Sequence, residues 1–111
     1  MHSATPTVLY LLVLSHFVAD YPLQSEFMAK HKSPLNSLAA APWGYVLASH
    51  AAVHAIGVYL VTGSAVLSVI EFLLHSYIDY GKCLGFFGIH VDQALHLIVK
   101  VFLFALFVGG V

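Results

Sequence analysis

The segment EFLLHSYID, residues 71–79, decides the fold class of this chain. Its ionisable residues, Glu71, His75 and Asp79, are each four positions apart, so on an α-helix they share one face. The positions between them are mainly apolar. Ionisable side chains in such an apolar segment face the interior of a helix bundle rather than lipid. The segment therefore predicts a helix whose polar face packs against other helices.

The same four-residue spacing occurs in three other apolar segments. The residues that show this spacing are His16 with Asp20, His50 with His54, and Asp92 with His96 and Lys100. Each segment approaches the roughly 20 apolar residues that a membrane-spanning helix needs. The sequence therefore predicts an all-α fold, an integral membrane four-helix bundle with antiparallel up-down topology. This single transmembrane domain covers residues 1–111, with spans at approximately 6–22, 43–61, 64–80 and 90–108.

The composition agrees with a membrane chain. Of the 111 residues, 60% are hydrophobic and 8% are charged, whereas ordinary soluble domains are about 45–50% apolar and about 25% charged. The chain has no arginine and a net charge of −1, so it lacks the basic surface that nucleic-acid binding requires. Its single cysteine excludes an intramolecular disulfide framework.

The lysines of the loops predict the orientation of the bundle. Lys30 and Lys32 lie between the first and second spans, and Lys82 lies between the third and fourth. The N-terminal tail, the turn at 62–64 and the C-terminus carry no lysine or arginine. Because loops rich in lysine and arginine stay on the cytoplasmic side, both termini are predicted to be non-cytoplasmic.

With this topology the polar residues fall into layers in the cytoplasmic half of the bundle. The shallow layer consists of Asp20, His50, Asp79 and Asp92. One helical turn deeper, about 5–6 Å, a second layer consists of His16, His54, His75 and His96. One turn deeper again, Glu71 and Lys100 are predicted to lie at one depth, as a structural buried pair.

Such a set of histidines and carboxylates, projecting inward from several helices, is how metal sites are built in bundle cores. We predict one or two divalent ions, zinc first, with iron or manganese as alternatives. The predicted ligands are His16, Asp20, His50, His54, His75, Asp79, Asp92 and His96. The pattern leaves open which of His50 and His54 ligates. His2, His31 and His90 lie outside the layers or at their edge and are expected to be packing residues.

Three ordered motifs resemble those of a known family. They are HFVADYPLQ at 16–24, HSYIDYGK at 75–82 and DQALH at 92–96. Together they resemble the uncharacterised domain-of-unknown-function family 3307, small integral membrane proteins of bacteria and phages. The resemblance implies a location in the bacterial inner membrane, but no established activity. A fainter likeness, limited to the His-x-x-x-Asp pairs, is to membrane-bound metal-dependent hydrolases.

The leading interpretation is a membrane-embedded divalent-metal-binding protein. Its activity would be metal-dependent hydrolysis of a lipid or lipid-linked substrate at the cytoplasmic leaflet. Asp20 and Asp79 are then the candidate general bases. Gln24, Gln93 and Lys82 are the residues that would orient the substrate.

Other functions stay open at this point. They are a metal-ion or proton transporter, a haem-binding protein, and a non-enzymatic membrane protein whose polar core only specifies helix pairing. The expected partners are the lipid bilayer, a lipid-linked substrate and further copies of the chain, with no nucleic acid.

Overall fold

The computed structural model describes residues 5–111, and within this range the chain is helical and contains no strand. This confirms the predicted all-α class. The α-helices are α1 (Thr5–Asp20), α2 (Glu26–His31), α3 (Trp43–Thr62), α4 (Ala65–Cys83) and α5 (Ile89–Val108). A 3-10 helix, η2 (Pro34–Asn36), follows α2.

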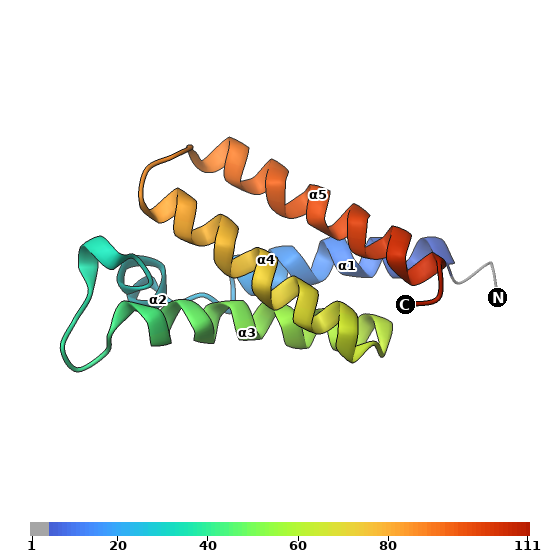
Figure 1. Cartoon of the computed structure of the whole chain (residues 1–111), viewed down its shortest axis with the longest axis horizontal. Coiled ribbons are helices and arrows are strands. Elements are labelled where there is room, and N and C mark those ends of the chain that lie inside the picture. Colours follow the sequence, from blue (N-terminus) through green and yellow to red (C-terminus); the bar gives the residue numbers. More distant parts are fainter. Residues whose placement is uncertain (1–4) are drawn as a thin grey trace.

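The four long helices pack in a closed ring, in which α1 and α4 each contact both α3 and α5. The start of α1, the α3–α4 turn and the end of α5 lie at one end of the molecule (Figure 1). The short helix α2 and the α4–α5 loop lie at the opposite end. Neighbouring helices therefore alternate in direction, as the up-down topology predicts.

The turn between α3 and α4 follows from its residues. Gly63 adopts a left-handed conformation with φ of 71°, and its N–H donates to the Tyr59 carbonyl at 2.7 Å. A glycine at this position closes a helix without steric penalty. Ser64 then caps α4, because its hydroxyl accepts a hydrogen bond from the Leu67 N–H. The break predicted at 62–64 is therefore confirmed.

The segment between α1 and α3 is more ordered than the sequence predicts. Ser25 caps α2 by accepting from the Met28 N–H, and Glu26 lies in the first turn, where a negative charge is favourable. Ser33 caps η2, which begins with Pro34. The segment packs against α3 and carries Lys32 to a buried position.

An apolar layer fills the bundle next to the α3–α4 turn. Every long helix contributes to it, through Leu12, Val58, Leu67, Val99 and Leu103. The buried histidines and aspartates lie closer to the α2 end of the interior, and Glu71 and Lys100 lie between them and this layer along α4 and α5. The interior is therefore divided along its length into an apolar half and a polar half.

Two helices, α3 and α5, are long and apolar enough to cross a membrane. Helix α1 is apolar but has only 16 residues. Helix α4 carries Glu71, Asp79 and Lys82, which lowers its overall hydropathy. Length and composition therefore support a membrane location through α3 and α5. By these two criteria alone, the predicted spans at 6–22 and 64–80 are not membrane-spanning helices.

Candidate metal centre

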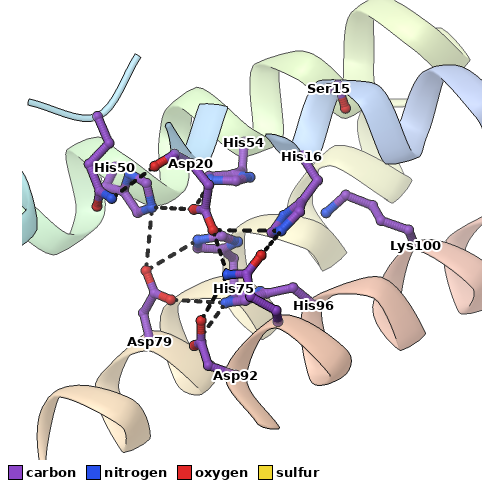
Figure 2. Close-up of polar contacts among 12 residues, drawn as sticks. Ser15, His16, Asp20, His50, His54, His75, Asp79, Asp92, His96 and Lys100 are labelled. Atoms are coloured by element: carbon purple, nitrogen blue, oxygen red, sulfur yellow. Dashed lines mark hydrogen bonds and ion pairs between the residues drawn. The ribbon is translucent and has the colours of Figure 1, made fainter. Parts of the chain in front are cut away.

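Five imidazole rings meet in the polar half of the bundle (Figure 2). They come from all four long helices, and each is at most 2% exposed: His16, His50, His54, His75 and His96. His75 lies at the centre, with its ring centroid 3.7 Å from that of His54 and 4.2 Å from that of His96. The i, i+4 spacing thus brings together the histidines that the sequence assigned to the two layers.

Asp20 is the carboxylate on the α1 side of the cluster. Its Oδ1 lies 3.2 Å from His50 Nε2 and 3.0 Å from His54 Nε2. Its Oδ2 accepts a hydrogen bond from the Gln93 amide at 2.9 Å. Both His50 and His54 therefore contact the same oxygen, so the structure brings both of these candidate ligands to Asp20.

Asp79 is the carboxylate on the α4 side. Its Oδ1 lies 2.9 Å from His96 Nε2. Its Oδ2 accepts a hydrogen bond from the Lys32 ammonium at 3.0 Å and also lies 3.2 Å from His75 Nε2. The one carboxylate therefore connects the C-cap residue of α2 with helices α4 and α5.

Gln93 connects α5 to α1. Its amide nitrogen donates to Asp20 Oδ2 at 2.9 Å and to Asp92 Oδ2 at 3.1 Å. Its amide oxygen lies 3.0 Å from His16 Nε2, so this ring nitrogen is the donor. Both ends of the Gln93 amide are thus occupied within the cluster. Its predicted role in orienting a substrate stays a prediction.

The five histidines differ in the hydrogen-bond partner of their Nδ1 atom. His75 Nδ1 lies 3.1 Å from Glu71 Oε2, and Glu71 Oε1 accepts a hydrogen bond from Lys100 at 2.7 Å. The predicted buried pair of Glu71 and Lys100 is therefore confirmed. By contrast, Nδ1 of His16, His50 and His54 is buried with no hydrogen-bond partner among the described residues.

Two groups of side chains have ligand atoms close enough together to hold a metal ion. One consists of Asp20, His50, His54 and His75, and the other of His75, Asp79 and His96. All their members are buried. His16 and Asp92 were also predicted as ligands, but they lie beside these groups, bound to Gln93. The described chain thus provides a nitrogen-rich site with carboxylates at two sides.

Lys32 is the site residue that the sequence analysis missed. The sequence assigned it to a loop, as a charge that orients the bundle. Instead it is 7% exposed, bound to Asp79 and to the side-chain oxygen of Gln24. Gln24 also donates to the Asp20 backbone carbonyl at 3.0 Å, so it positions Lys32 against the end of α1. The Lys82 side chain makes no hydrogen bond or ion pair with another residue of 5–111, although its backbone carbonyl accepts from the Gly85 N–H.

The remaining histidines lie away from the cluster. His31 Nδ1 lies 2.8 Å from the Asn36 carbonyl, which ties α2 to η2. His90 is exposed at the start of α5. His2 lies outside the described residues. His31 and His90 are thus separate from the five central rings, but the exposed His90 is not the packing residue that the sequence predicted.

The sequence model of a protein family, described as "Protein of unknown function (DUF3307)", matches residues 8–109. The match covers nearly the whole chain, so the chain belongs to this family. No curated protein and no solved structure matches the chain. The arrangement of the side chains therefore carries the functional argument.

Proposed function

We propose that this member of the DUF3307 family is an integral membrane protein that holds a divalent cation among its buried histidines and aspartates. The observation that carries the proposal is the contact between His75 and Asp79. His75 Nε2 lies 3.2 Å from Asp79 Oδ2 but forms no hydrogen bond with it. In the neutral ring, Glu71 accepts from Nδ1 and the lone pair lies on Nε2. A cation beside these two electron donors would turn their repulsion into attraction.

The donor set favours zinc among the divalent ions. Three imidazoles and one carboxylate converge in the group around Asp20, and zinc sites in proteins are most often four-coordinate with such ligands. Imidazole also suits iron, and carboxylates suit manganese. His75 belongs to both groups but has only one free nitrogen. The simplest occupancy is therefore a single ion bound to His75, with its other ligands taken from one of the two groups.

The surface of α4 supports a membrane position for all four long helices. Val69, Leu73 and Tyr77 are between 57% and 73% exposed. Each is two positions from a buried ionisable residue, which places it roughly on the opposite face of the helix. The helix thus carries its charges inside and apolar side chains outside. Such a surface fits lipid better than water.

A bound divalent ion would activate water as a nucleophile at neutral pH. Asp20 and Asp79 are the carboxylates placed to accept the proton of that water. An apolar groove of about 420 Å³ lies between α1 and α3, and its lining includes Ala19 and Val53, the chain neighbours of Asp20 and His54. We therefore include hydrolysis of a lipid or lipid-linked substrate at the cytoplasmic leaflet in the proposal. The Lys82 ammonium, which forms no ion pair among residues 5–111, is available to a substrate anion.

Transport of an ion or proton across the bundle is the weaker alternative. The buried apolar layer from Leu12 to Leu103 closes the interior on the side of the α3–α4 turn. Proton and ion pathways need polar groups along their length. A flux assay in liposomes tests this alternative, and we expect no flux above that of empty liposomes.

Calorimetric titration of the detergent-solubilised protein with zinc, iron(II) and manganese(II) tests the proposal. We expect saturable binding that is lost in His75→Ala and His96→Ala. The control His31→Ala should bind as the wild type does. Products of membrane lipids incubated with the metal-loaded protein then test hydrolysis, with Asp79→Asn as the inactive variant. Absence of binding for all three metals would overturn the proposal.

A further inference from the structure

We infer that Glu71 and Lys100 are positioning residues that set the tautomer of His75, so that its Nε2 faces the metal. This inference rests on the proposed metal site and deepens it. The three side chains form a linear chain of contacts. Lys100 Nζ lies 2.7 Å from Glu71 Oε1, and Glu71 Oε2 lies 3.1 Å from His75 Nδ1. None of the three is more than 1% exposed.

The chemistry of these contacts determines where the proton lies. Lys100 Nζ donates to Glu71 Oε1 at 2.7 Å, so an ammonium faces this buried carboxyl group from the side opposite His75. A carboxylate only accepts hydrogen bonds, so His75 Nδ1 must carry the proton. The neutral ring then has its lone pair on Nε2, the nitrogen that faces Asp79. Metal-binding histidines commonly have their second nitrogen fixed by a carboxylate in this way.

The other rings lack this arrangement. Nδ1 of His16, His50 and His54 has no partner among residues 5–111, whereas their Nε2 atoms face oxygens of Gln93 or Asp20 that can only accept, so in these rings the contacts place the proton on Nε2. If one of these rings bound metal through Nε2, its Nδ1–H would be a buried donor without an acceptor, which is unfavourable. His75 is therefore the histidine that is preset as a ligand.

Stability alone does not account for the pair. Replacing a buried ion pair by apolar residues of similar size is often neutral or stabilising, because both charges lose their hydration when they are buried. Glu71 and Lys100 lie beside the apolar layer of Leu67 and Leu103, where apolar residues would also pack. A role in orienting His75 explains why a charged pair occupies this depth.

Two double variants separate the hydrogen-bond acceptor from the charges. Glu71→Leu/Lys100→Met removes both charges and the acceptor. Glu71→Gln/Lys100→Met also removes both charges, but the amide oxygen of glutamine can still accept from His75 Nδ1. Single removal of Lys100 is avoided, because it would leave Glu71 buried and uncompensated. Leu103→Met, in the apolar layer about one helical turn from Lys100, is the packing control.

The zinc affinity of each purified variant is measured by competition with a chromophoric chelator. We expect the Leu/Met variant to bind zinc about 10–100-fold more weakly than the wild type, the usual effect of losing such a partner. The Gln/Met variant and Leu103→Met should bind within a few-fold of the wild type. Equal affinity of the Leu/Met and Gln/Met variants would overturn the inference, because the acceptor would then be irrelevant.

Nitrogen-15 spectra of the His75 ring provide a readout that needs no metal. We expect Nδ1 to be protonated in the wild type and in the Gln/Met variant, and a mixture of tautomers in the Leu/Met variant. A His75 ring protonated at Nε2 in the metal-free wild type would overturn the inference. Should the wild type bind no zinc while Nδ1 is protonated, the tautomer assignment would stand and the proposed metal function would fall.

Discussion

The Lys32 ammonium lies 3.0 Å from Asp79 Oδ2, and both side chains are almost completely buried. This contact joins the short helix α2 to the centre of the cluster on α4. It places a positive charge of the chain itself next to a carboxylate that also faces His75 and His96. Lys32 thus compensates the negative charge of Asp79 from the side of α2. A metal ion bound by the histidines would compensate the same charge from the opposite side.

Replacing Lys32 should destabilise the metal-free protein. Removing one partner of a buried pair leaves an uncompensated charge, and the typical loss is about 3–5 kcal/mol. We expect Lys32→Met to lower the free energy of unfolding by this order in chelator, measured by denaturation in detergent. Saturating zinc should reduce the difference, because the ion also compensates Asp79.

The neighbouring Lys30 provides the matched control, since it is exposed on the same short helix. Lys30→Met should change stability by no more than about 0.5 kcal/mol. If Lys32→Met and Lys30→Met behaved alike, the buried ion pair with Asp79 would not contribute to stability.

Asp20 should be needed for both folding and metal binding. Its carboxylate contacts His50, His54 and Gln93, and an asparagine offers only one acceptor oxygen in its place. We expect Asp20→Asn to lower the free energy of unfolding by about 1.5–3 kcal/mol, as for hydrogen bonds to charged groups, and to weaken zinc binding. Glu26→Gln, exposed at the start of α2, is the control for loss of a carboxylate charge. Unchanged zinc affinity in Asp20→Asn would exclude this residue from the site.

The metal affinity should depend on pH in the direction that histidine ligands require. An imidazole must be neutral to donate its lone pair, so protons compete with the metal. We expect zinc affinity, measured by calorimetry between pH 5 and 8, to fall as the pH is lowered through about 6.5, the ordinary value for histidine. Affinity that stayed constant down to about pH 4, where free carboxylates begin to protonate, would indicate a site without histidines.

The arrangement of the helix ends makes the topology testable. The α3–α4 turn lies at the same end of the molecule as the end of α5. Reporter fusions inserted at Gly63 and after Val111 should therefore report the same side, and the lysine distribution predicts the non-cytoplasmic side. Opposite readings from the two fusions would contradict four spanning helices.

The spacing of ionisable residues predicted most of the site, because helical geometry turns a four-residue interval into a shared face. It also predicted the contact of Glu71 with Lys100, since antiparallel helices of known direction bring fixed positions to one depth. The predicted third span, 64–80, differs from α4 by one residue at its start and three at its end.

The sequence did not predict that Lys32, which lies outside the long helices, belongs to the site. Lys32 belongs to a segment without a regular spacing of apolar residues. In such a segment the sequence pattern does not distinguish a buried lysine from a solvent-exposed one. Its position depends on α2, a helix of six residues whose packing against α3 is a tertiary effect. The position of Gln93 was missed for a related reason: it lies next to Asp92 in sequence, but its side chain reaches across to α1.

The central claim is most directly tested by the metal content of the protein, measured by inductively coupled plasma mass spectrometry after purification in detergent without added metal. The account predicts roughly one divalent ion per chain, zinc first. The ion should be absent from a His75→Ala/His96→Ala variant and retained in His31→Ala. A wild-type protein that contains no divalent metal, and whose melting temperature does not rise with added zinc, iron or manganese, would contradict the claim.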